Sequence, residues 1–233
     1  MNNIIELKHI TKSYLEGGVN STILKNVDFA VNANDMISII GRSGAGKSTA
    51  LNIIALLEEP DENNNSQVII DGIDCTKLSH DERNKLRLEK MGIIHQQSYL
   101  FSDLTVLENI AAPIMLMNNS KLTSELEDKI FQELKLFNLE HKIKEYPKNL
   151  SGGEKQRVTL ARCSIKKPKI ILADEPTGSL DSKSVDEILD LFINVLKKEK
   201  GATIVLVTHD NFVAKRSDKI YSVENRAIIE KTI

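Results

Sequence analysis

The sequence predicts an α/β domain built around a parallel sheet, and three observations support this prediction. Short apolar runs typical of buried strands recur along the chain, separated by stretches with helical spacing. A glycine-rich loop joins one of these runs to the helical stretch that follows it. Residues 105–146 have a helical pattern without any strand signal, which indicates a helical subdomain inserted into the α/β chain.

The bulk composition limits the classes of function. With 233 residues and 41% hydrophobic content, the chain can form one large domain or a core with a smaller subdomain. A net charge of −2 gives no overall positive field, so nucleic acid is not expected as a partner. Cys75 and Cys163 have neither disulfide-like nor metal-like spacing, which is typical of reduced cytosolic thiols. We find neither a signal peptide nor a run of about 20 apolar residues, so a membrane role requires a partner.

The N-terminal segment predicts two paired strands at residues 3–9 and 22–31, because apolar and polar residues partly alternate there. Gly17 and Gly18 indicate a turn between them. Tyr14 is expected between the two strands. Its ring could stack on a purine base, or it could be a tyrosine packed on the surface.

A phosphate-binding loop follows the buried strand predicted at residues 36–40 and precedes a helix at 49–57. Its glycines let the backbone approach phosphate oxygens, and its amides together with the helix N-terminus favour an anion. Lys47 can reach the β- and γ-phosphates, and the Ser48 hydroxyl can bind Mg²⁺. The loop and the next residue are Gly41, Arg42, Ser43, Gly44, Ala45, Gly46, Lys47, Ser48 and Thr49. The sequence therefore predicts a P-loop core that binds a nucleoside triphosphate.

Gln96 follows the second of two short strands that come after the phosphate loop. Because parallel α/β sheets present ligand groups at the C-terminal ends of their strands, Gln96 could bind Mg²⁺ or hold a water. It could equally be an ordinary loop amide. In this region the sequence predicts a surface loop at 58–66, a strand at 68–70, a charged helix at 80–90 and the second strand at 92–94.

The helical insert shows two apolar stripes at helical spacing, and Pro113 predicts a kink in the first. The stripes consist of Leu107, Ile110, Ile114 and Leu116, and of Leu126, Ile130, Leu134 and Phe137.

A possible second anion site begins at Ser151. Ser151 and Glu154 form a capping-box pattern at a helix start. Gly152 and Gly153 in the first turn each lower helix stability by about 1 kcal/mol relative to Ala. A helix tolerates such glycines better if a phosphate must approach its N-terminal amides. The cap and the anion site are compatible with each other.

Asp174 and Glu175 end an apolar strand predicted at residues 169–173. Asp174 can bind Mg²⁺ directly or through water. Glu175 is expected to project differently because side chains alternate along a strand, and it could orient or deprotonate an attacking water. The alternative is an acidic pair that caps a strand end. A tight turn at 177–181 should lead into a helix at 182–197.

His209 follows the last predicted core strand, residues 202–207. It could hydrogen-bond a γ-phosphate or the hydrolytic water, or it could be structural. Residues 218–223 and 226–230 predict a final hairpin.

Together these motifs resemble the ATP-binding-cassette (ABC) ATPases in order and spacing over nearly the whole chain. Residues 150–153, Leu-Ser-Gly-Gly, are the discriminating part, because many families have phosphate loops. The resemblance implies a P-loop core with an antiparallel β region at 1–97 and 166–233. It also implies an α-helical subdomain with the signature at 98–165.

The resemblance further implies a homodimer that binds two ATP molecules head to tail, with Mg²⁺ as cofactor. Each ATP would contact the phosphate loop of one subunit and the signature of the other. By position, the family roles are adenine stacking for Tyr14, β/γ-phosphate contact for Lys47 and Mg²⁺ coordination for Ser48, Gln96 and Asp174. The family's catalytic residues correspond to Glu175, Gln96 and His209. Contact with the partner's ATP falls to Ser151, Gly152, Gly153 and Glu154, and a cross-dimer contact falls to Asp181.

Within the family, residues 104–110 and 172–178 resemble compact bacterial ATPases of the lipoprotein-releasing, macrolide-exporting and cell-division type. Residues 138–141 and 208–216 favour lipoprotein release over macrolide or peptide export and cell division. This implies a membrane permease as partner and a peripheral position at the cytoplasmic face of the inner membrane.

The sequence disfavours two other classes, namely soluble ABC ATPases that act on DNA or ribosomes and catalytically inactive binding modules. DNA-repair relatives need a long coiled-coil insertion, and no sustained heptads occur here. Ribosome-acting relatives carry two cassettes in one chain, and this chain has one. A catalytically inactive binding module is disfavoured because every catalytic position of the family is filled.

Overall fold

The computed structural model describes residues 3–62 and 65–231. Asn63 and Asn64, which belong to the predicted loop at 58–66, lie outside the described residues. The chain forms two compact units, each described here by itself: unit 1 is Met1–Arg87 with Thr203–Ile233, and unit 2 is Leu88–Ala202. The predicted helical subdomain, residues 98–165, falls within the sequence range of unit 2.

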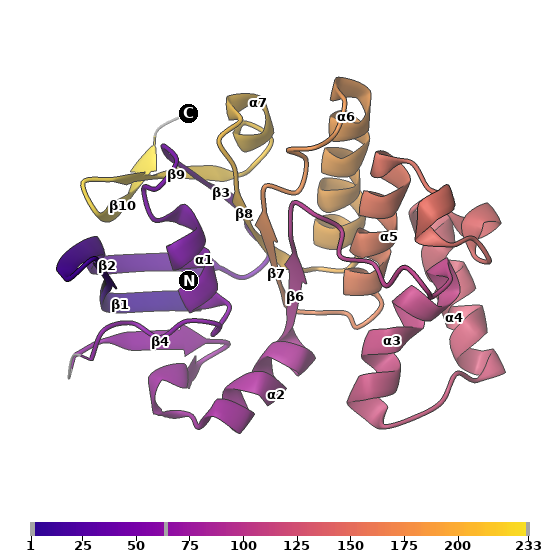
Figure 1. The fold of residues 1–233 in the computed structure, drawn as a ribbon, viewed down its shortest axis with the longest axis horizontal. Helices are drawn as coiled ribbons and strands as arrows, with labels where there is room; N and C mark the ends of the chain where they lie inside the picture. The colour runs from indigo at the N-terminus through magenta and orange to yellow at the C-terminus, as the bar shows by residue number, and fades with distance from the viewer. Residues whose placement is uncertain (1–2, 63–64, 232–233) are drawn as a thin grey trace. The chain divides into compact units, whose positions relative to one another are not determined.

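Unit 1 contains an antiparallel sheet and a mainly parallel one (Figure 1). The antiparallel sheet has the order β2-β1-β4-β5 and comprises β1 (Asn3–Glu16), β2 (Val19–Asn32), β4 (Gln67–Ile70) and β5 (Ile73–Asp74). The other has the order β10-β9-β3-β8 and comprises β3 (Met36–Ile40), β8 (Thr203–Val207), β9 (Lys219–Glu224) and β10 (Ala227–Lys231). Strand β3 pairs in parallel with β8 and β9, and β9 with β10 forms the predicted final hairpin.

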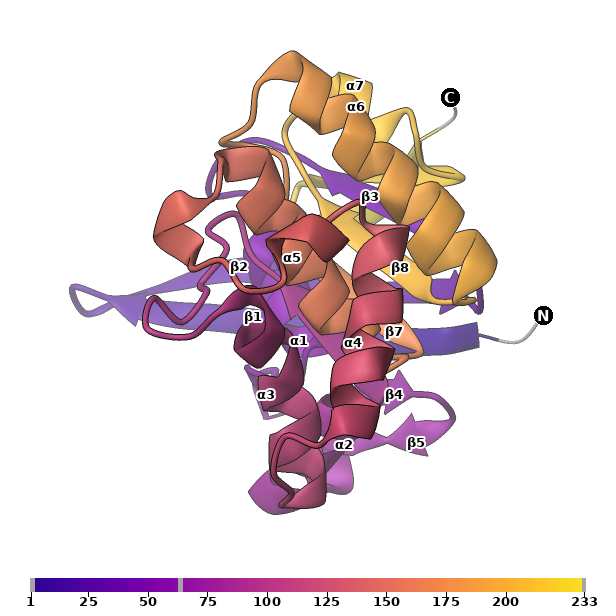
Figure 2. The same ribbon diagram turned by 90° about the vertical axis from the view of Figure 1, so that its right-hand side faces the viewer.

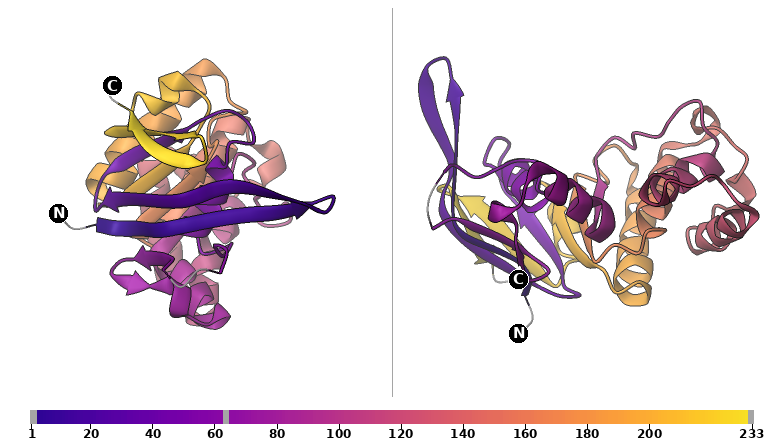
Figure 3. Two further views of the ribbon diagram at one scale, coloured as in Figure 1. Left: turned by 90° about the vertical axis from the view of Figure 1, so that its left-hand side faces the viewer. Right: turned by 90° about the horizontal axis from the view of Figure 1, so that it is seen from below.

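The hairpin of β1 and β2 is longer than predicted (Figure 3, left). Gly17 and Gly18 form the expected turn with φ of 57° and 81°. Such a turn needs only two residues, so the ladder continues to Glu16. The prediction that Tyr14 lies between the strands is therefore wrong: it lies within β1, opposite Ser21 of β2.

Helix α1 (Lys47–Ile54) contacts β4 of one sheet and β8 of the other. It buries Ala50, Leu51, Ile53 and Ile54, so it fills the core between the two sheets of unit 1. The remaining helices of this part are η1 (Cys75–Lys77), α2 (His80–Lys90), which starts in unit 1, and α7 (Asn211–Ala214).

Unit 2 pairs β6 (Met91–Ile94) in parallel with β7 (Ile170–Asp174). Its longer helices are α3 (Val106–Asn118), α4 (Ser124–Leu136), α5 (Gly152–Ser164) and α6 (Ser182–Asp190). Short turns η2 (Glu140–Lys142) and η3 (Pro147–Asn149) precede α5, and α6 runs into the π-helical segment η4 (Leu191–Glu199). Helix α3 packs against α4 and α5 (Figure 2), and residues 105–146 contain no strand, as predicted. The single helix expected at 182–197 is instead an α-helix followed by a π-helix.

The two apolar stripes of the insert have different outcomes. In α4 the predicted stripe is confirmed, since Ile130 and Leu134 are fully buried. In α3 the predicted stripe is confirmed only in part, because Ile110 is fully buried whereas Leu116 is 75% exposed. Asn109, next to Ile110, is also buried, and its side chain donates to the carbonyls of Phe101 and Leu104.

Both cysteines are buried free thiols, in line with the absence of disulfide spacing. Among the helices formed by residues 3–62 and 65–231, none combines the length and apolarity needed to cross a membrane.

Gly92 of β6 provides a test of the packing in unit 2. A Cβ at Gly92 would lie 2.0 Å from Cys163 Sγ on α5, closer than any real contact. We expect Gly92→Ala to lower the free energy of unfolding by about 1–3 kcal/mol through overpacking. The double variant Gly92→Ala/Cys163→Ala removes the sulfur and should recover most of that loss in urea unfolding. Cys163→Ala alone is the control, and a double variant no more stable than Gly92→Ala would contradict this packing.

Candidate functional site

The phosphate loop joins β3 to α1 in unit 1, which is the strand–loop–helix context that the sequence predicts. Gly41, Gly44 and Gly46 all have positive φ values, of 155°, 75° and 105°. At Gly46 a Cβ would meet Ile23 Cγ2 at 2.6 Å, and φ lies in the region that favours glycine. The loop therefore requires glycine both for its backbone path and for its approach to β2.

Lys47 places its ammonium across this loop. Although Lys47 is only 9% exposed, its Nζ donates to the carbonyls of Gly41 at 2.9 Å and Arg42 at 3.1 Å. Ser48 is exposed in the first turn of α1. The ammonium and the N-terminal end of α1 both favour an anion at the loop.

Tyr14 lies beside the first turn of α1. Its hydroxyl donates to Glu58 Oε1 at 2.5 Å and lies 3.2 Å from Thr49 Oγ1. Burial raises the pKa of Tyr14, and the hydrogen bond to Glu58 raises it further. The structure thus brings Tyr14, a predicted base-stacking residue, next to the phosphate loop.

His209 lies at the same sheet edge as the loop. Strands β3 and β8 are parallel, with Ile39 paired to Val207, and the Thr208 amide donates to the Ile39 carbonyl at 3.2 Å. The loop and His209 both continue from this edge, and the His209 side chain is exposed. Unit 1 therefore brings together three predicted features: Tyr14, the phosphate loop and His209.

In unit 2, Gln96 and Asp174 leave the same edge of the β6–β7 pair, where Ile94 is paired with Ala173. A Cβ at Gly178 would lie 2.9 Å from Gln96 Nε2. The carboxamide of Gln96 therefore packs on the turn that follows Asp174. Gly178 was not singled out from the sequence, although the run Pro-Thr-Gly at 176–178 marks a turn.

Glu175 lies just beyond β7 and has a φ of 47°, in the left-handed region. The prediction that strand alternation orients its side chain is wrong, because Glu175 lies beyond β7 in a turn closed by the Gly178 amide on the Glu175 carbonyl at 3.1 Å. A non-glycine residue in this region stores about 1–3 kcal/mol of strain, and such strain is concentrated at functional sites.

The predicted capping box at the start of α5 is confirmed. The Ser151 amide donates to Glu154 Oε2 at 2.8 Å, and the Glu154 amide donates to Ser151 Oγ at 3.3 Å. The backbone hydrogen bond from Ser151 lowers the pKa of Glu154, and Lys142 Nζ lies 3.2 Å from its carboxylate. The carboxylate is therefore committed to the cap, and contact with a second ATP stays a prediction.

Asp181 caps α6 by accepting hydrogen bonds from the Ser184 amide at 3.0 Å and the Ser184 hydroxyl at 2.8 Å. The backbone hydrogen bond lowers the pKa of Asp181. A Cβ at Gly153 would lie 3.1 Å from Ser184 Oγ, and one at Gly152 would lie 3.6 Å from Leu180 Cδ2. The signature and the Asp181 turn, both predicted to face a second subunit, are therefore neighbours.

The predicted Mg²⁺ ligands all carry oxygen donors. Within residues 3–62 and 65–231, no three His, Cys, Asp or Glu side chains gather as a metal-binding group. Mg²⁺ is usually held by one or two protein oxygens together with substrate phosphates. The hydroxyl of Ser48, the amide of Gln96 and the carboxylate of Asp174 are donors of this kind.

Comparison with known proteins gives a consistent family. A family model described as ABC transporter matches residues 24–178. The lipoprotein-releasing system ATP-binding protein LolD of Buchnera aphidicola is 40% identical over 229 residues, which cover 98% of each chain. LolD of Rickettsia bellii is 40% identical over 228 residues, covering 97% of this chain and 98% of the relative.

Solved structures agree with this. The dimeric structure of MJ0796, a bacterial ABC transporter cassette, has a TM-score of 0.86 and 39% identity, with 98% of both chains covered. A dimeric post-hydrolysis state of MJ0796 bound to ADP and Pi also has a TM-score of 0.86, at 38% identity and 98% coverage of both chains. The cbiO1 protein from Clostridium perfringens has a TM-score of 0.84 and 26% identity, covering 98% of this chain and 88% of its own.

Gly178→Ala tests the contact with Gln96. The new methyl group should displace the flexible carboxamide rather than the backbone. We therefore expect the free energy of unfolding to stay within about 0.5 kcal/mol of the wild type, while ATP hydrolysis falls roughly tenfold. Gln96→Ala is the reference, and Gly178→Ala should add little to its effect. A fully additive double variant would show that Gly178 does not act through Gln96.

Proposed function

The chain belongs to the ABC transporter family, and on this premise we propose that it hydrolyses ATP to drive a lipoprotein-releasing transporter. The observation that carries the proposal is the identity of 40% to LolD proteins over nearly the full length of both chains. The relatives' names support lipoprotein release over macrolide or peptide export and over a cell-division role.

The ATP sites are composed of two copies of the chain. One copy supplies the phosphate loop at the start of α1, and the other supplies the signature at the start of α5. Both are helix N-termini, which favour phosphate, and they lie in different units of the chain. The MJ0796 cassette is dimeric, in line with this arrangement.

Each predicted residue then has a defined task. Lys47 and the loop amides hold the β- and γ-phosphates, and Tyr14 stacks on the adenine. Ser48, Gln96 and Asp174 supply oxygens for Mg²⁺, which when bound neutralises charge on the phosphate oxygens. Residues Glu175 and His209 act around the γ-phosphate, Glu175 by orienting or deprotonating the water.

The released energy reaches a separate membrane permease through the segment that follows Gln96, and the chain acts as a peripheral subunit at the cytoplasmic face of the membrane. Tyr99 and Phe101 in this segment are 64% and 55% exposed. Arg162 of α5 donates to the carbonyls of Ser98 and Tyr99, each at 3.0 Å. Helix α5, which begins with the signature, therefore contacts the exposed segment directly through Arg162.

Replacing the proposed base tests the chemistry. Glu175→Gln keeps the shape of the side chain but removes its basicity. ATP hydrolysis should fall by about 10²–10⁴-fold, while the Kd for ATP should stay within about twofold. The control is Glu127→Gln, at an exposed glutamate of α4, which should change neither value. Turnover at the wild-type rate in Glu175→Gln would remove Glu175 from its assigned role.

The partner is tested by affinity purification of the tagged chain from detergent-solubilised membranes, followed by mass spectrometry. We expect a membrane subunit with few spans and a large extracytoplasmic domain. Deletion of that subunit should cause lipoproteins to accumulate in the inner membrane. Recovery of ribosomal or DNA-bound proteins alone would contradict the transport function but leave the ATPase chemistry intact.

A further inference from the structure

Glu58 contacts Tyr14 from outside the phosphate loop. It lies four residues after the end of α1, and its Oε1 atom accepts the hydrogen bond from the Tyr14 hydroxyl at 2.5 Å. The same oxygen lies 3.4 Å from Lys12 Nζ, and the Glu58 and Lys12 side chains are only 21% and 16% exposed. The Glu58 carboxylate is therefore a partly buried group with two partners rather than an exposed group.

The hydrogen bonds around Tyr14 have a fixed direction. Tyrosine has one hydroxyl proton, and an ionised carboxylate can only accept. Since that proton goes to Glu58, the Thr49 hydroxyl must be the donor in its 3.2 Å contact with Tyr14. Two contacts of defined direction thus hold the phenol, one of them to the helix that begins at the phosphate loop.

Lys12 lies near the Tyr14 ring. Its Nζ lies 5.4 Å from the ring centroid, within the range of a cation–π contact. The carbonyl of Glu59 holds this ammonium at 2.7 Å. The Tyr14 ring is therefore held in place before a base stacks on it. Its hydroxyl group is hydrogen-bonded, and Lys12 lies beside the ring.

We propose that Glu58 is a positioning residue for the nucleotide base. It holds Tyr14 as a preformed stacking platform and, through Thr49, ties that platform to the phosphate loop. This inference rests on the adenine-stacking role proposed above for Tyr14. Because a mobile side chain must be ordered when a ligand binds, a platform that is ordered beforehand should strengthen nucleotide binding roughly two- to tenfold.

The test compares two ligands by titration calorimetry on the whole chain. ADP carries the base, whereas inorganic pyrophosphate reaches only the phosphate loop. We expect Glu58→Ala to weaken ADP binding about two- to tenfold and to leave pyrophosphate binding unchanged. Glu58→Gln retains an acceptor oxygen and should keep most of the ADP affinity.

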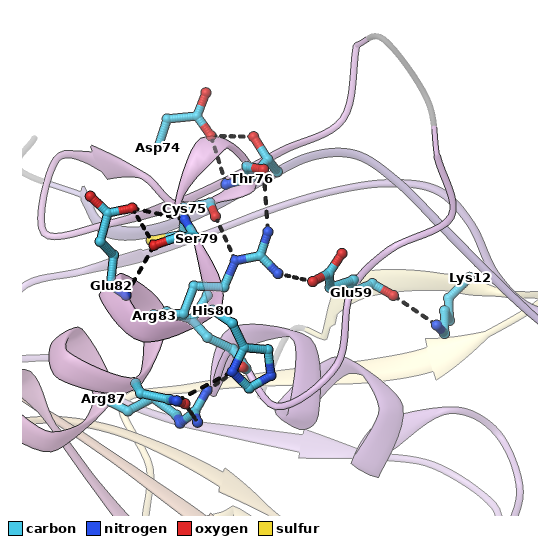
Figure 4. A network of polar contacts seen from close by, with 12 residues as sticks. Lys12, Glu59, Asp74, Cys75, Thr76, Ser79, His80, Glu82, Arg83 and Arg87 are labelled. Carbon is cyan, nitrogen blue, oxygen red and sulfur yellow. Dashed lines mark hydrogen bonds and ion pairs between the residues drawn. The ribbon is translucent and has the colours of Figure 1, made fainter.

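Glu59 is the matched control, one residue along the same loop. Its carboxylate pairs with Arg83, which also donates to the carbonyls of Cys75 and Thr76 (Figure 4). Glu59→Ala removes that pair but keeps the backbone carbonyl that holds Lys12. It should therefore change neither the ADP nor the pyrophosphate affinity.

The outcomes separate this inference from the proposed function. Equal weakening of ADP and pyrophosphate by Glu58→Ala would show a general disturbance of the loop and would overturn the positioning role. If Tyr14→Ala weakens ADP binding but Glu58→Ala does not, the positioning role alone is refuted. If Tyr14→Ala leaves ADP binding unchanged, the adenine role of Tyr14 fails, and the inference about Glu58 fails with it.

Discussion

The parallel register of a few strands determines where the reactive groups lie. In unit 1, the pairing of Ile39 with Val207 brings the phosphate loop and His209 to one edge. In unit 2, the pairing of Ile94 with Ala173 does the same for Gln96 and Asp174. A shift of either pair by one residue would move one partner away from its edge and reverse its side chains. Within each unit, the placement of these groups therefore depends on a buried, apolar ladder more than on any single polar contact.

The two helix N-termini that we propose to bind phosphate are built differently. At α1 the N-cap residue is Gly46, which makes no side-chain cap. At α5 the capping box uses the amides of Ser151 and Glu154. The amides of Gly152 and Gly153 lie between these two and carry no side chain that would block an approaching phosphate. The capping box is therefore confirmed and leaves room for the predicted anion contact, which stays a prediction.

Local patterns predicted the features that are themselves local. The phosphate loop, the strands around it, the capping box and the α4 stripe all depend on residues close in sequence. The errors arose where a nearby side chain or turn overrides the periodic pattern of a helix or strand. In α3 the polar Asn109 is buried and donates to loop carbonyls, and Glu175 lies in a turn closed by the Gly178 amide. No pattern in the sequence indicates the contact of Glu58 with Tyr14, because the two residues are far apart in the chain and meet only after folding.

The most direct test of the composite site mixes two variants, each of which is inactive alone. Lys47→Ala inactivates the phosphate loop and leaves the signature intact, whereas Ser151→Arg inactivates the signature and leaves the phosphate loop intact. In a head-to-tail dimer of the two, one ATP site combines an intact loop with an intact signature. We predict that each variant alone hydrolyses ATP at background rate and that the mixture regains a clear fraction of wild-type hydrolysis. A mixture as inactive as its parts would contradict ATP sites shared between two copies.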